Sequence, residues 1–154
     1  MDYLLLKFMH VLGAVVMLGT GTGIAFFMLM AHRSGDAAFI ARTAKVVVIA
    51  DAIFTAFAVV LQPVTGYLLV RATGRALTDP WIMLSLAFYL GAGAFWLPVV
   101  RIQMKLRDLA TAAADAGTAL PSAYHRYFRI WLAFGFPGFG FTIAILWLMI
   151  AKPF

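Results

Sequence analysis

The sequence predicts an all-α integral membrane protein folded as a four-helix up-down-up-down bundle, and three observations lead to this class. The 154 residues are 64% hydrophobic and 12% charged, about half the charged share of a soluble globular domain. Four apolar stretches are each long enough to cross about 30 Å of hydrocarbon, for which a helix needs roughly 20 residues. Short polar connections join the stretches, which favours antiparallel neighbours.

The predicted spans cover residues 4–31, 44–70, 81–106 and 124–151, and the chain 1–154 is expected to form a single transmembrane domain. The first span is expected to be a retained helix and not a cleaved signal, because no basic segment precedes it and its apolar run is too long. The lipid bilayer is therefore the first expected partner.

Lysine and arginine are distributed unequally between the two ends of this bundle. Eight lie in or beside the connections 1–2 and 3–4, and four lie toward the opposite end. Because cytoplasmic loops carry the excess of basic residues, the chain is expected to be a multi-pass membrane protein with both long connections in the cytoplasm and both termini outside. This topology accounts for the net charge of +6, so nucleic acid is not an expected partner. The eight residues are Arg33, Arg42, Lys45, Arg101, Lys105, Arg107, Arg126 and Arg129; the four are Lys7, Arg71, Arg75 and Lys152.

The composition also excludes several kinds of chemistry. Cysteine is absent, which excludes disulfides, thiolate nucleophiles and zinc fingers. Glutamate is absent as well, and the six aspartates are the only carboxylate side chains. The sequence therefore disfavours metal hydrolases and glycosidases, which depend on paired carboxylates.

Polar residues form a stripe along the second predicted span. Asp51, Thr55, Gln62 and Thr65 lie within about 40° of one line on a helix. Such a stripe is expected to face the bundle interior or a partner, because an ionised carboxylate facing lipid is costly. Pro63 is expected to kink this helix.

The third span carries a second polar stripe, made of Ser85, Tyr89, Trp96 and Gln103. Two polar faces in one small bundle exceed what membrane insertion requires. In the fourth span, the glycine- and proline-rich segment 134–140 predicts a kink or a loosened turn near mid-membrane.

Glycines in the first span predict close helix packing. Gly19 and Gly23 form a G-x-x-x-G pair, which allows two helix backbones to approach each other. The same lack of side chains would also leave space for a flat cofactor against the backbone.

His10 is the strongest candidate for a functional residue. It lies inside the first span, about 10 Å from mid-membrane on the outer side. A histidine within a transmembrane segment is a functional-site hypothesis by default. Gly13, Ala14, Met17 and Gly21 share its helix face, and a neutral imidazole beside small residues suits a b-type haem whose iron His10 would bind.

Side chains at a comparable depth on the other helices are Gln62, Thr65 and Tyr89, which we expect to contact the same cofactor. The alternative is that His10 hydrogen-bonds to one of these groups and binds no cofactor. His32 and His125 lie at the opposite helix ends, too far away to share the iron, although they could frame a second site.

Several segments also resemble a known family. They are 3–14 (YLLLKFMHVLGA), 61–66 (LQPVTG), 96–100 (WLPVV), 107–110 (RDLA) and 147–153 (WLMIAKP). Over nearly the whole chain, this pattern resembles an uncharacterised family of bacterial integral membrane proteins with a domain of unknown function. The resemblance implies a four-helix membrane fold and assigns no activity.

The first helix bears a more distant resemblance, through its Lys7-x-x-His10 start, to HemJ-type protoporphyrinogen oxidases and to the membrane domain of CopD-like copper-resistance proteins. The HemJ likeness implies haem b bound by His10. The HemJ pattern carries Trp and Arg further along this helix, where the present chain has Met17 and about Phe26, and its later Lys has no counterpart in 81–100. The CopD likeness implies copper bound by His10 with methionine sulfur as a soft ligand.

These observations favour a haem-b redox protein, either an electron-transfer protein or an oxidoreductase acting on a hydrophobic substrate such as a porphyrin or a quinol. A homodimer could supply the second axial ligand, and a membrane redox partner the electrons. One alternative is a non-catalytic assembly subunit, which would be colourless when purified. Another is a small oligomeric transporter or channel in which Asp51 and Gln62 line the path.

Overall fold

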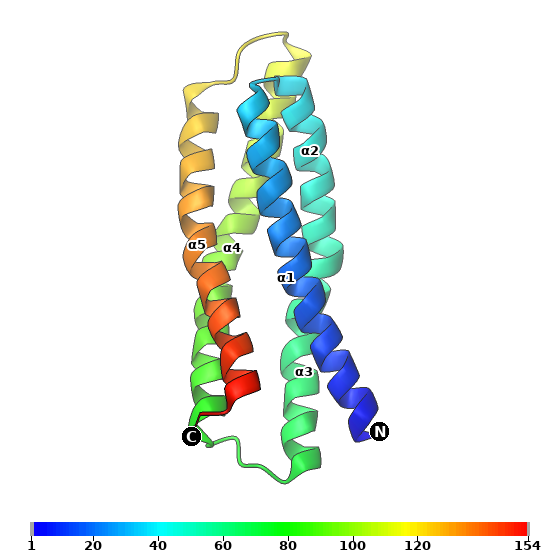
Figure 1. Ribbon diagram of the computed structural model, residues 1–154. Helices are drawn as coiled ribbons and strands as arrows, with labels where there is room; N and C mark the ends of the chain where they lie inside the picture. Colours follow the sequence, from blue (N-terminus) through cyan, green and yellow to red (C-terminus); the bar gives the residue numbers. More distant parts are fainter. Residues whose placement is uncertain (1, 154) are drawn as a thin grey trace.

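The computed structural model describes residues 2–153, which form a bundle of four long helices running alternately up and down (Figure 1). No strand occurs within the described range. The elements are α1 (Tyr3–Ser34), α2 (Ala37–Ala50), the π-helix η1 (Asp51–Thr55), α3 (Ala56–Thr73), α4 (Pro80–Asp115) and α5 (Ser122–Ala151). Because α2, η1 and α3 are continuous, they make one long helix, and each of the four long helices is apolar enough to cross a membrane. The predicted fold class is confirmed.

Local signals end and begin these helices. Gly35 ends α1 with a φ of 69°, a left-handed conformation that glycine adopts without strain. Asp36 then caps α2, because its carboxylate accepts hydrogen bonds from the backbone N–H groups of Ala38 and Phe39. Pro80 occupies the first turn of α4, where a missing N–H costs nothing.

Two helix boundaries differ from the predicted ones. The second long helix begins at Ala37 and not near 44, so the first connection is only a tight turn. The third continues to Asp115 and not to 106, because the alanine-rich segment after 106 is a good helix former. Ala110 and Ala113 of this extension are buried, so it also packs against the bundle.

The backbone stays helical at the prolines where we expected kinks. α3 continues through Pro63, and α5 continues through Pro137 with a change of direction about halfway along its length (Figure 1). The hydrogen bonding of the second long helix is also irregular at η1, where the Ala56 N–H bonds to the carbonyl of Asp51 five residues earlier. No sequence pattern predicted this π-helix, and such segments are frequent at functional sites.

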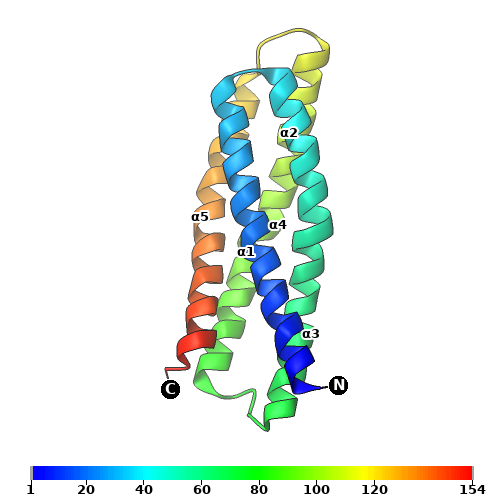
Figure 2. The ribbon, with the colours of Figure 1, turned by 45° about the vertical axis from the view of Figure 1, so that its right-hand side comes forward.

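The bundle is packed unevenly along its length. The main buried cluster lies among α1, α2, α4 and α5, and α3 contributes no residue to it. Toward the end that carries the termini, α1 packs against α3 and α4 packs against α5, whereas α3 and α4 are not among the closely packed pairs (Figures 1 and 2). The cluster consists of Ile24, Met28, Ala31, Ile40, Ala41, Ala44, Val47, Leu106, Ala110, Tyr124, Phe128 and Trp131.

Both termini lie at one end of the bundle, together with the connection between α3 and α4 (Figures 1 and 2). The other two connections lie at the opposite end, as the up-down topology requires. Large apolar side chains cover the outside, among them Phe57, Leu90, Phe136 and Ile150, and these membrane-embedded helices contact the lipid bilayer. The assignment of the termini to the outer face stays a prediction.

Candidate functional site

His10 lies between α1 and α3, in the half of the bundle that carries the termini. Its side chain is half-buried, and Nδ1 is 2.8 Å from the hydroxyl oxygen of Thr65 on α3. Thr65 is buried, so this bond connects the two helices away from the lipid. The prediction that Thr65 lies at the depth of His10 is confirmed by this distance.

The hydrogen bonds of Thr65 determine which nitrogen of His10 carries the proton. Thr65 Oγ1 lies 2.7 Å from the carbonyl oxygen of Leu61, one turn earlier, and donates its single hydrogen to the helix backbone. The same oxygen therefore accepts a hydrogen bond from His10 Nδ1–H. This assignment leaves Nε2 with a free lone pair, and within residues 2–153 it has no hydrogen-bond partner.

Gln62 fixes the backbone beside this imidazole. Its side-chain nitrogen donates a hydrogen bond of 2.8 Å to the carbonyl oxygen of His10. The carboxamide occupies the space over Gly13, where a Cβ atom would overlap Gln62 Nε2. Gly13 therefore allows close approach of α1 and α3, and the room we predicted for a cofactor at this position is filled by Gln62.

Gly66 of α3 lies against the imidazole ring of His10. A Cβ atom at this position would lie 3.3 Å from His10 Cε1, tighter than ordinary van der Waals contact. The imidazole thus lies edge-on against the α3 backbone, held by Thr65 on one side.

The structure does not bring every predicted site residue to His10. Ala14 and Met17 continue the same face of α1 and are half-buried. Tyr89, which we expected to contact the cofactor, donates instead to the carbonyl oxygen of Val59, nearly two turns from Thr65. Tyr89 therefore connects α4 to α3 at a deeper level of the bundle.

A second polar cluster lies at η1. Asp51 is 5% exposed, and its carboxyl oxygens accept hydrogen bonds from Trp96 Nε1 at 3.3 Å and from Gln103 Nε2 at 3.1 Å. Gln103 Oε1 in turn accepts from Trp131 Nε1 at 3.1 Å. The two predicted stripes thus meet inside the bundle, as expected. The sequence did not identify Trp131 as a member, because a tryptophan on α5 follows no polar pattern.

The histidines at the opposite end form an aromatic cluster. His32 stacks on Phe128, with ring centroids 3.7 Å apart, and His32 Nδ1 lies 3.4 Å from the hydroxyl of Tyr124. The ring of His125 is 5.8 Å from that of His32. Residues 2–153 contain no group of three histidine or carboxylate side chains that could hold a metal ion.

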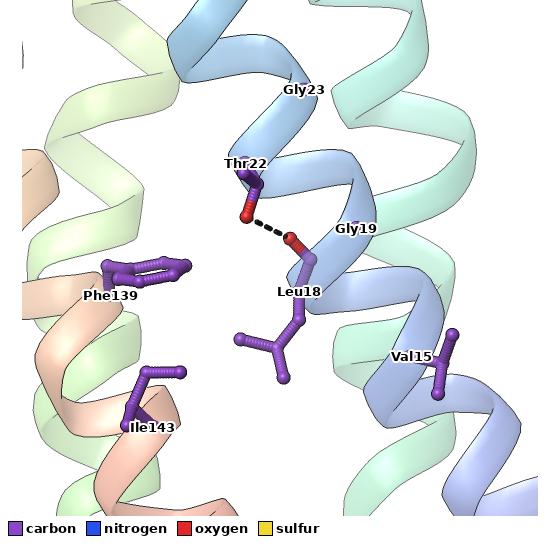
Figure 3. A pocket seen from close by; sticks show the side chains of 7 residues that line it. All are labelled: Val15, Leu18, Gly19, Thr22, Gly23, Phe139 and Ile143. Atoms are coloured by element: carbon purple, nitrogen blue, oxygen red, sulfur yellow. Dashed lines mark hydrogen bonds between the residues drawn. The ribbon is translucent and has the colours of Figure 1, made fainter.

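An apolar groove of about 550 Å³ separates α1 from α5 (Figure 3). Gly19 and Gly23, for which we expected close helix contact, border this groove, and nothing lies within 4 Å of a Cβ atom built on either residue. That expectation is wrong within the monomer, because α1 packs chiefly on α3 and α2. The hydroxyl of Thr22 is turned onto the Leu18 carbonyl, as Figure 3 shows, so the surface of the groove is mainly apolar. Its lining residues are Val15, Leu18, Gly19, Thr22, Gly23, Phe139 and Ile143.

Comparisons with known proteins identify the family of this chain. Residues 4–153 match a family model described as "Predicted integral membrane protein (DUF2269)". No curated protein and no solved structure matches the chain. The match extends over all four long helices and agrees with the resemblance carried by the segments at both ends. The chain therefore belongs to this family of predicted integral membrane proteins.

Proposed function

We propose that this protein binds haem b through His10 and acts in membrane redox chemistry. The observation that carries the proposal is the 2.8 Å contact between His10 Nδ1 and Thr65 Oγ1, because the donation of the Thr65 hydroxyl to its own helix assigns the ring proton to Nδ1 and leaves Nε2 free to bind iron. A histidine that ligates a metal commonly donates its other ring N–H to an oxygen, which fixes the tautomer and orientation of the ring. His10 and Thr65 have this relationship inside the membrane.

The single free nitrogen of His10 suits a haem better than a free metal ion. A single metal ion needs several protein ligands, and the described residues offer no cluster of three. Haem iron needs a protein ligand only at an axial position, so one oriented imidazole is sufficient. When bound, the haem would supply one-electron transfer through its iron.

The residues around His10 would divide the supporting roles. Thr65 orients the imidazole, Gly66 leaves room for its edge, and Gln62 holds the backbone of His10. Lys7 lies one turn nearer the membrane surface on α1, and its ammonium group could pair with a carboxylate of the cofactor.

The substrate in this proposal is a hydrophobic electron donor that enters from the bilayer, such as a quinol or a porphyrin. The second axial ligand would come from a second copy of the chain or from another helix. We also place the protein in a bacterial inner membrane, with His10 on the outer side and a membrane redox partner. The excess of lysine and arginine toward the other end supports this orientation.

An absorption spectrum tests the proposal. The full chain, purified in detergent from cells supplied with haem precursor, should show a Soret band with a matched iron content. The band should be lost in His10→Ala and kept in His125→Ala, which removes an exposed histidine at the other end of the bundle. Thr65→Val should keep the band and weaken haem affinity about 10- to 100-fold.

One result would reject haem binding. If the wild-type chain stays helical and monodisperse but colourless, and shows no Soret shift when titrated with haem, His10 is a packing residue joined to Thr65. The same result would favour a non-catalytic assembly subunit, which needs no cofactor.

A further inference from the structure

Asp51 is an isolated ionisable group in the middle of the bundle, and the proposed haem site makes no use of it. The residue is 5% exposed. Between Lys45 and Arg71 of the second long helix, no other residue is an Asp, Glu, Lys or Arg. Neither ion pair of the described residues includes it. A buried carboxyl group inside a membrane helix without a cationic partner is costly unless its hydrogen bonds favour a defined state.

The chemistry of the partners determines which group donates and which accepts in each hydrogen bond of Asp51. The indole N–H of Trp131 can only donate, so Gln103 accepts with its oxygen and turns its NH₂ group to Asp51. Trp96 also can only donate, and it bonds to the other carboxyl oxygen. Two donors therefore hold an ionised carboxylate, and neither can accept a proton from it.

Thr55 provides the acceptor that the other partners lack. It is 6% exposed, and its hydroxyl lies beside the carboxyl group without a hydrogen-bond partner of normal geometry within the described chain, so it can turn to donate to an ionised carboxylate or to accept from a protonated one. The π-helix η1 contains both residues and turns both into the interior. A protonated carboxyl group at Asp51 would donate to this unpaired oxygen, so the cluster can satisfy either state.

We propose that Asp51 is a proton-binding site within the membrane, held by Trp96 and Gln103 when ionised and donating to Thr55 when protonated. The site binds one proton and releases it unchanged, so no oxidant or further reactant is needed. The proposal uses none of the residues around His10 and does not depend on haem binding.

Few other titratable side chains lie near Asp51, so its protonation is the main change of charge at the centre of the bundle. α1 carries no titratable residue between His10 and His32, and α5 carries none between Arg129 and Lys152. On α4, Tyr89 bonds to the carbonyl oxygen of Val59. The nearest charged side chains on the packed elements are all exposed on the outside of the bundle; they are Lys45, Arg101, Lys105 and Arg129.

Infrared difference spectroscopy tests the site directly. Spectra of the full chain in lipid nanodiscs, taken with isotope-labelled aspartate across a pH titration, should contain a C=O band of a protonated carboxyl group that shifts with the label. Asp51→Asn should remove the band. Asp108→Asn should keep it, because Asp108 is an exposed carboxylate paired with Arg107. If Asp51→Asn leaves every such band of the folded protein unchanged across the titration, the proposal is overturned.

A second variant keeps the test decisive if Asp51→Asn does not fold. Thr55→Val preserves the shape of the side chain and removes only the proposed acceptor. Because the protonated carboxyl group of Asp51 then has no acceptor for its hydrogen, its C=O band should shift in frequency in Thr55→Val. A C=O band that is unchanged in Thr55→Val would contradict the role of Thr55 and overturn the proposed site.

Discussion

Replacement of Gly13 by alanine tests whether α1 and α3 are held together by the contact that surrounds His10. The added Cβ would overlap Gln62 Nε2 and lie 3.3 Å from Leu61 Cδ2. The carboxamide of Gln62 must therefore move, which breaks its 2.8 Å hydrogen bond to the carbonyl oxygen of His10. We expect Gly13→Ala to be destabilising even though alanine favours a helix.

The magnitude follows from three opposing contributions to the free energy of unfolding. A lost hydrogen bond costs about 1 kcal/mol, and overpacking a tight contact costs about 1–3 kcal/mol. Helix propensity returns about 1 kcal/mol when glycine becomes alanine. The net loss for Gly13→Ala should be about 1–3 kcal/mol.

Gly19→Ala is the matched control, since it makes the same chemical change on the same helix. Nothing lies within 4 Å of its added Cβ, so this variant should be neutral or stabilised by up to about 1 kcal/mol. Equilibrium unfolding in mixed micelles, followed by far-ultraviolet circular dichroism, measures both. The combined variant Gly13→Ala with Gln62→Ala should lose less than the sum of its parts, because the overlapping group is gone.

Two results would refute the reasoning. Equal stability of Gly13→Ala and Gly19→Ala would show that Gln62 does not occupy the space over Gly13. Strict additivity of Gly13→Ala and Gln62→Ala would show that the two residues are not in contact.

Two further predictions concern the other half of the bundle. Gln103→Leu removes one of the two donors to Asp51 and leaves the Trp131 N–H without its partner, and should lower the unfolding free energy by about 3–5 kcal/mol. Trp131→Phe, which leaves only one amide oxygen unpaired, should cost less in the same unfolding experiment, and equal losses would contradict the network. Asp36→Ala removes both cap hydrogen bonds of α2 and should cost about 1 kcal/mol, whereas Asp36→Asn should cost little; a neutral Asp36→Ala would show that the cap does not stabilise the turn.

The polar sites at Asp51 and at His10 lie in parts of the bundle where the helices pack differently. Asp51 borders the half of the bundle where four helices surround the buried cluster, and both of its donors come from α4, one of them held in turn by Trp131 of α5. His10 lies in the half where the helices are arranged as two pairs, and its hydrogen bonds reach only α3. The contacts of His10 are therefore separate from the main buried cluster.

Much of the candidate site could be predicted because the bilayer limits where polar residues can go. His10, Gln62 and Thr65 had to face protein, and the structure joins all three by hydrogen bonds. Gly66 and Trp131 were not predicted as partners, because a glycine and a tryptophan are also common where helices simply pack or meet the membrane surface. Tyr89 was assigned to the wrong partner, since depth along a helix does not specify which neighbour a side chain reaches.

By itself, the sequence determined that this chain crosses the membrane four times, because stretches of apolar residues in a bilayer have only the helix available to satisfy their backbone groups. It also determined which faces are polar, since helix periodicity places Asp51 and Thr65 on one side. Only the tertiary structure decided that the glycine pair at 19 and 23 borders a groove while Gly13 receives Gln62. Small residues permit close approach on any face of a helix, and the choice among faces depends on contacts between residues far apart in the chain.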